Sequence, residues 1–152
     1  MRKFVTTRIR DCIAEYLRAN LEIVETGAEI VTRERAKLPS QIAEIIAGIK
    51  LGIIVMPAVA IKANANTDPL YVETLQVTIR VVETVLNDTE YEAEEIAELL
   101  HTYLHGWKLP PTIDGEPLLF SEPNDPMMPG SVGDNYYVDC IFNTHGGVPF
   151  KR

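Results

Sequence analysis

The stretch ETLQVTIRVVETV, residues 73–85, alternates between apolar and polar side chains along most of its length. Its apolar members are Leu75, Val77, Ile79 and Val81, and Gln76, Thr78 and Arg80 stand between them. Successive side chains of a β-strand point to opposite faces, so this alternation predicts a strand with one buried and one polar face. Such one-sided burial is typical of antiparallel sheets.

The preceding stretch IIVMPAVAIKA, residues 53–63, is apolar at nearly every position. This pattern predicts a strand that is buried on both faces. Pro57 has no N–H to donate to a strand ladder, which indicates either an edge position or a bulge at this point. We expect the strand to form a hairpin with residues 73–85 through a long, exposed connection at 63–71.

The N-terminal third predicts two helices with a short strand between them. The first helix begins near Thr6 or Thr7 and buries an apolar stripe made of Val5, Ile9, Cys12, Ile13, Tyr16 and Leu17. EIVTRER, residues 29–35, has the composition of a short strand. The second helix covers residues 40–50, with Ser40 as its N-cap and Gly52 as its stop.

The C-terminal part predicts one more strand, NYYVDCIFNT at 135–144, followed by a tail that begins at His145. Tyr136 and Tyr137 point to opposite faces of this strand, one toward the core and the other toward the surface or an interface. Residues 108–134 are rich in Pro, Gly and Asp and predict one long irregular loop, with LLF at 118–120 as a brief strand within it.

The order of these elements predicts a single domain over residues 1–152 with an α+β fold. We expect a mainly antiparallel sheet of about four to five strands with helices packed on one face. The composition, 46% hydrophobic and 24% charged, fits an ordinary globular chain. A net charge of −8 argues against nucleic acid as the main partner, because phosphate binding requires a basic surface. We also expect no membrane-spanning segment, no signal peptide and no disulfide framework.

The stretch HTYLHGW, residues 101–107, places His101 and His105 four residues apart, a spacing that suits a metal ion. It closes a helix predicted to begin at a capping box of Thr89 and Glu92. The apolar stripe of this helix turns both histidines toward solvent. Thr102 stands where a metalloprotease would have its glutamate, and the remaining histidine, His145, lies in the tail.

A helix end explains the same stretch better than a metal site does. Gly106 suits the left-handed position after a helix, Trp107 can fold back on the last turn, and Pro110 and Pro111 prevent continuation. We therefore predict that His101 and His105 hold no metal ion.

Other chemistry has little support in the sequence. It contains neither a phosphate-binding glycine loop nor a G-x-S-x-G elbow. The acidic pairs Asp134 with Asp139 and Glu94 with Glu95 fit solvated surfaces better than a cation or acid–base site. Cys12 belongs to an apolar stripe and is expected to be unreactive. We predict no catalytic, cofactor-binding or metal-binding residues, and no enzymatic activity.

The order of segments resembles the tail-terminator (tail-completion) and neck proteins of bacteriophages and prophages. The likeness rests on an amphipathic N-terminal helix, EIVTRER, the strand TLQVTIRVVETVLN leading into AEEIAELLHTYLHGWKLP, the late LLFSEP and the closing strand YYVDCIFNTHGG. It implies an α/β sheet flanked by helices that assembles as a ring on the tail tube. The helix at 40–50 is not part of the general family pattern, and the family has no site motif from which residues could be transferred.

The resemblance implies a structural protein of the virion tail or neck, made in the bacterial cytoplasm, whose partners are its own copies and other tail or neck proteins. In this hypothesis, residues 123–135, with Met127 and Met128, contact a neighbouring subunit. One alternative is a small bacterial adaptor that binds a protein through the 108–134 loop. Another is a small metal-dependent enzyme that uses His101 and His105, together with His145.

Overall fold

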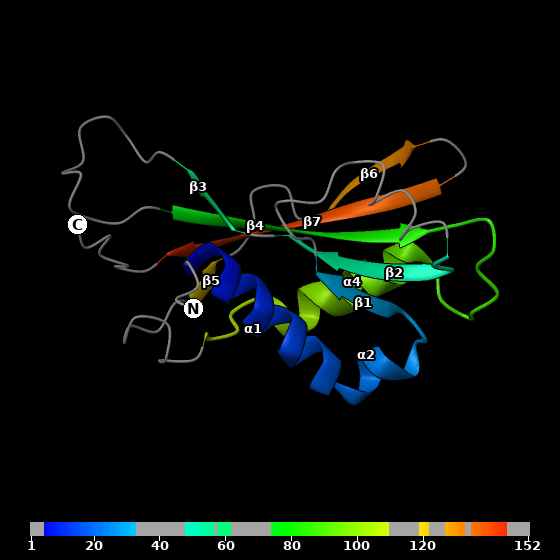
Figure 1. Cartoon of the computed structure of the whole chain (residues 1–152), viewed down its shortest axis with the longest axis horizontal. Coiled ribbons are helices and arrows are strands. Elements are labelled where there is room, and N and C mark those ends of the chain that lie inside the picture. The colour runs from blue at the N-terminus through cyan, green and yellow to red at the C-terminus, as the bar shows by residue number, and fades with distance from the viewer. Residues whose placement is uncertain are drawn as a thin grey trace.

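The computed structural model of the protein describes residues 5–32, 48–56, 58–61, 74–109, 119–121, 127–132 and 135–145. Helices and strands occur in the order α1 (Val5–Ala19), α2 (Leu21–Glu25), β1 (Glu29–Thr32), β2 (Leu51–Val55), β3 (Val59–Ile61), β4 (Thr74–Glu83), α4 (Ala93–Leu104), β5 (Leu119–Ser121), β6 (Met127–Val132) and β7 (Asn135–His145). In Figure 1 the helices lie together beneath one twisted sheet. Within the described ranges, none of the helices combines the length and hydrophobicity needed to span a bilayer.

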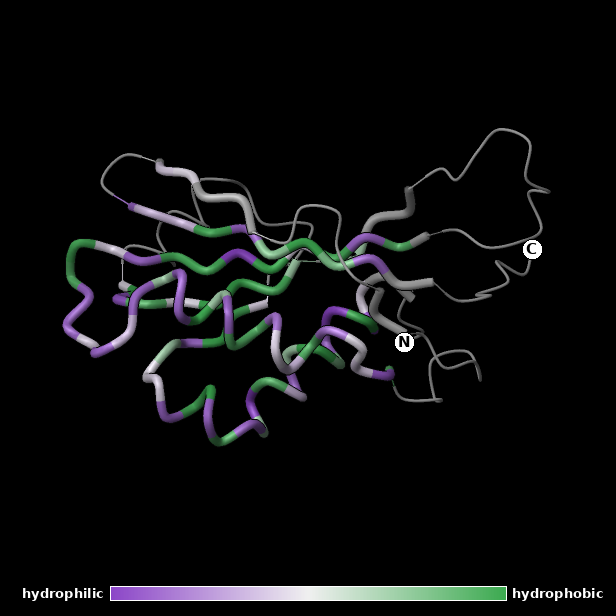
Figure 2. The backbone as a smooth tube through the Cα atoms, turned by 180° about the vertical axis from the view of Figure 1, so that it is seen from behind, coloured by the Kyte–Doolittle hydropathy of each residue, from purple (hydrophilic) through white to green (hydrophobic). Residues whose placement is uncertain are grey.

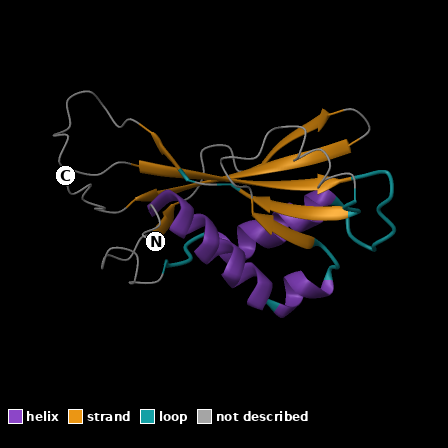
Figure 3. Ribbon diagram, viewed as in Figure 1, coloured by secondary structure: helices purple, strands orange, loops and turns teal. Residues whose placement is uncertain are grey.

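The sheet confirms the predicted α+β class. Its strand order is β1-β2-β4-β7-β5, and β3 also pairs with β4 while β6 also pairs with β7. Among the described strands, β1 and β2 pair in parallel and the other pairs are antiparallel. As Figure 3 shows, β4 and β7 form the long centre of the sheet, and the three described helices pack against one side of it. We call this side the helix face and the opposite side the outer face.

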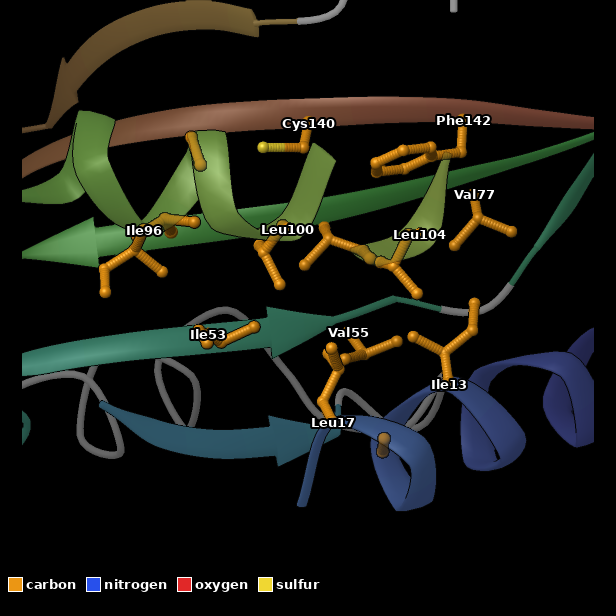
Figure 4. Close-up of a cluster of buried hydrophobic side chains, with 14 of the residues drawn as sticks. Ile13, Leu17, Ile53, Val55, Val77, Ile96, Leu100, Leu104, Cys140 and Phe142 are labelled. Atoms are coloured by element: carbon orange, nitrogen blue, oxygen red, sulfur yellow. The ribbon is translucent and has the colours of Figure 1, made fainter. Parts of the chain in front are cut away.

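The alternation of apolar and polar residues in 73–85 matches the alternation of buried side chains along β4. Leu75, Val77, Ile79 and Val81 are buried on the helix face. They meet the apolar side of α1, which includes Ile13 and Leu17, and that of α4, which includes Ile96, Leu100 and Leu104 (Figure 4). Val138, Cys140 and Phe142 of β7 complete this core. Burial of these aliphatic side chains is the main stabilising contribution to the fold.

The strand expected at 53–63 is present but interrupted. β2 pairs Val55 with Ile79, whereas β3 pairs Val59 with Gln76, so the pairing with β4 shifts by one residue between β2 and β3. The register shift is that of a β-bulge, one of the two arrangements that Pro57 suggested. Pro57 itself lies outside the described residues.

Several local expectations are corrected. Gly52 does not stop a helix but lies within β2, and a Cβ there would come within 2.7 Å of Ile49 Cγ2. Residues 33–47, which include most of the predicted 40–50 helix, are outside the described part. The short helix α2 was not predicted. It forms because the Asn20 side chain accepts hydrogen bonds from the N–H groups of Glu22 and Ile23, while Gly27 adopts a φ of 81° just after the helix.

The helix predicted from Thr89 begins later, because Glu92 is the N-cap of α4. Thr89 remains in the preceding turn, where its hydroxyl donates to Asn87 Oδ1. A carboxylate from the sheet takes over the capping role, since Ala93 N–H donates to Glu83 Oε1 at 3.0 Å. Glu95 also accepts from the Glu92 N–H at 3.1 Å. Negative charges at these positions favour the helix N-terminus.

Candidate functional site

The two histidines of HTYLHGW lie at the end of α4 with their rings stacked. The ring centroids of His101 and His105 are 5.3 Å apart, and their planes differ by 5°. His105 is exposed, but His101 is half-buried with its ring 6.4 Å from that of Phe142. The expectation that both face solvent is therefore wrong for His101. Because α4 packs closely on β7, the flank of the helix is covered as well as its central stripe.

A third metal ligand is not found beside this pair among the described side chains. His145 belongs to the end of β7, where its backbone pairs with Leu119, and not to a tail as predicted. Within the described residues, no group of three His, Cys, Asp or Glu side chains is arranged to hold a metal ion.

The geometry of residues 104–107 is that of a helix end. Gly106 has a φ of 79°, and the Trp107 N–H donates to the Leu104 carbonyl at 3.0 Å. The Trp107 ring then stacks on Tyr16 of α1 with ring centroids 4.4 Å apart. Trp107 thus joins the two main helices, a long-range contact that the sequence did not indicate.

The acidic pairs considered from the sequence have structural partners. Glu94 accepts a hydrogen bond from the Tyr136 hydroxyl, Glu95 caps α4, and Asp139 binds Arg80. Asp134 lies outside the described residues. Burial raises the pKa of the Cys140 thiol to about 12, and burial also raises the pKa of the Cys12 thiol, so both cysteines favour the unreactive thiol form.

The outer face of the sheet carries one compact group of side chains from three strands. Arg80 on β4 stands opposite Asp139 on β7 and binds its carboxylate at 2.7 Å. The Arg80 guanidinium also lies 4.0 Å from the centre of the Tyr137 ring. Tyr137 in turn covers Gly130 of β6, where a Cβ would come within 2.5 Å of its phenol carbon. Tyr136 packs toward the core, as predicted for one member of the tyrosine pair.

The segment 108–134, predicted as an irregular loop, contains two strands. β5 covers Leu119–Ser121, near the predicted LLF strand, and β6 covers Met127–Val132. β6 pairs with β7 along its whole length, and Val132 stands opposite Asn135, so Met127 and Met128 are sheet residues and not loop residues. The sequence did not predict this strand because it contains proline and glycine, which disfavour strands in general. Both residues nevertheless fit an edge strand that is paired on one side.

Comparison with known proteins supports the fold and leaves the family open. No protein-family model matches the chain, and no curated protein matches its sequence. One solved structure, whose name specifies no function, is similar over 94% of this chain and 93% of its own, with a TM-score of 0.52 and 16% sequence identity. At this level of identity the likeness concerns the fold alone.

Proposed function

We propose that this chain is a structural protein of a phage or prophage particle that acts at the tail end or neck by assembling into a homo-oligomeric ring. The segment order of the sequence first suggests this role. The subunit would add to a growing ring and close the end of the tail tube. Its mechanism is then steric, and it depends on surfaces that match those of neighbouring copies.

The observation that supports the proposal most directly is the one-sided construction of the sheet. The described helices α1, α2 and α4 all lie on the helix face, so none of them covers the outer face (Figure 3). Among the described strands, β1 pairs only with β2, and β6 pairs only with β7. Strand edges paired on one side can bind another chain.

The two edges are also different from each other, as a ring requires. β1 runs parallel to its neighbour, and Arg18 of α1 donates to its Ile30 carbonyl at 3.1 Å. The opposite edge consists of β6 and β5, which run antiparallel to β7. Contacts between unlike surfaces are heterologous, and heterologous contacts that close generate rings.

Sedimentation velocity over a wide concentration range, in metal-free buffer and with added zinc, tests the proposal. We expect a closed oligomer that forms with increasing concentration and is indifferent to zinc. Negative-stain electron microscopy of the same sample should show rings of uniform diameter.

The same experiment separates the alternatives. A monomer at every concentration contradicts ring formation by the isolated chain and favours the adaptor, whose partner would bind through residues 108–134. Association that requires stoichiometric zinc, and is lost on replacing His101 and His105 by alanine, favours the metal-dependent alternative.

A further inference from the structure

Two aliphatic side chains are buried on the outer face of the sheet, where none of the described helices lies. Ile54 of β2 is 4% exposed and Val82 of β4 is 3% exposed. Both belong to the outer face, because Ile54 stands opposite Arg80 and Val82 stands opposite Tyr137. Neither is part of the core that the helices build on the helix face. Figure 2, which shows the molecule from behind, colours much of the sheet as hydrophobic.

Neighbouring side chains of the sheet do not account for this burial. Side chains stand roughly perpendicular to a sheet, so neighbours on the same face flank an aliphatic group without covering its end. The exposed fractions of Ile54 and Val82 are those of a single chain, so the cover comes from the chain itself. A segment other than the described helices therefore covers these two side chains.

Ile49, just before β2, already packs on this face. Its side chain is 3% exposed, and its Cγ2 lies 2.7 Å from the position that a Cβ on Gly52 would take. Gly52 stands opposite Val82, so this position is on the outer face. Thr84 fixes the same stretch to the end of β4, because its hydroxyl donates to the Ile49 carbonyl at 2.9 Å. The chain therefore enters β2 with an isoleucine on the outer face.

The connection that reaches β2 through Ile49 has to cross the sheet. β1 and β2 are parallel neighbours, and β1 ends at Thr32 while β2 begins at Leu51. Parallel neighbours need a crossover connection of a dozen or more residues, usually with a helix in it. Residues 33–50 have this length, and Ile49 indicates that the outer face is the one they cross.

The sequence of this connection suits an apolar surface. Aliphatic residues recur in it at positions i, i+3, i+4 and i+7, which form one stripe of a helix: Ile42, Ile45, Ile46 and Ile49. We call these four residues the isoleucine stripe. Its last member is the one that packs on the outer face beside Gly52. A helix that continues from there presents the rest of the stripe to the same side.

We propose that the connection between β1 and β2 crosses the outer face and that its isoleucine stripe covers Ile54 and Val82. Removal of these aliphatic groups from water stabilises the contact. The inference does not depend on the ring assembly proposed above. Its consequence for that assembly is that the part of the outer face formed by β2 and β4 is filled by the subunit itself, so a neighbouring copy binds elsewhere.

Thiol labelling at position 82 tests this cover. In V82C/C12S the introduced thiol should react slowly with an aromatic disulfide reagent, whereas the thiol of V85C/C12S, at a position 77% exposed, should react rapidly. Adding I45D/I46D to V82C/C12S should raise the labelling rate by about tenfold or more, because the stripe no longer covers the thiol. Adding L70D, in a different connection, is the matched control and should leave the rate unchanged. Buried Cys140 reports on folding, since it should react only in unfolded protein.

The inference is overturned if the thiol at position 82 reacts as fast as the one at position 85 in folded protein. It is also overturned if the rate rises as much with L70D as with I45D/I46D, or rises with neither. If I45D/I46D does not fold, I45A/I46A decides, with a smaller increase expected in the same direction. A parent protein that never self-associates overturns the proposed ring and leaves the cover of the outer face intact.

Discussion

Arg80 and Asp139 face each other across β4 and β7, and the guanidinium donates two hydrogen bonds to the carboxylate, 2.7 Å from Nε to Oδ1 and 3.0 Å from Nη2 to Oδ2. A paired geometry of this kind fixes both side chains and is stronger than a single contact. It joins the two central strands on the face that the described helices leave uncovered.

Removing one partner of this pair should destabilise the protein. We expect Arg80→Met and Asp139→Asn each to lower the free energy of unfolding by about 1–2 kcal/mol, the lower part of the range for charged hydrogen bonds, because Arg80 is partly exposed. Urea unfolding of both variants and of the double variant should show that the two effects are not additive. Lys50→Met is the control, since the exposed Lys50–Asp88 pair should contribute nothing measurable.

The absence of a side chain at Gly130 should be required for full stability, because the Tyr137 ring lies over this residue. Gly130→Ala places a methyl group where the phenol ring stands and forces the ring away from Arg80. The free energy of unfolding should fall by about 1–3 kcal/mol, as for other substitutions that overfill a packed site. In a Tyr137→Leu background the same substitution should cost much less. An equal cost in both backgrounds would show that the conformation of Gly130, and not the ring, sets the requirement.

Trp107 and Tyr16 should report on the docking of α4 against α1. Trp107 is the single tryptophan of the chain, and its ring stacks on Tyr16. Tyr16→Leu should therefore change the Trp107 emission of the folded protein and lower stability by about 0.5–1.5 kcal/mol, the value of an aromatic pair. Tyr91→Leu offers a control at another half-buried tyrosine of the core. Emission unaltered by Tyr16→Leu would contradict the stack.

The two thiols should differ in reactivity. A thiolate, not a thiol, attacks aromatic disulfide reagents, and burial raises the pKa of Cys140 to about 12. At pH 8 the folded protein should release at most one equivalent of the reagent chromophore, slowly and from Cys12, and two equivalents after unfolding. The Cys12→Ser variant identifies the reacting thiol.

The raised pKa of Cys140 also gives the sign of a pH effect. The folded thiol stays protonated while an unfolded one ionises above pH 9.0, so stability from this position is complete below pH 9.0 and is lost as the pH rises toward about 12. Rapid release of two equivalents at pH 8 would show that Cys140 is accessible in the native state.

The sequence by itself determined the elements whose periodicity is strong. The alternation from Leu75 to Val81 fixed which face of β4 is buried, and Gly106 marked the end of α4, because both signals depend on local geometry. The order of the predicted elements likewise indicated the α+β class. It could not reveal that Glu83 caps α4 or that Glu92 replaces Thr89 as the N-cap, since Glu83 comes from a strand whose position relative to the helix is set by packing.

Only the tertiary structure decided the relationships between distant residues. The sequence placed Arg80 and Asp139 on polar faces of two strands, but their pairing depends on the register of β4 with β7, which is set by burial of the whole helix face. β6 was not predicted because its proline and glycine have low strand propensity. In the structure, the ladder with β7 and the Tyr137 ring compensate for this low propensity. The parallel pairing of β1 with β2 arises from how the chain folds back on itself and has no local signal.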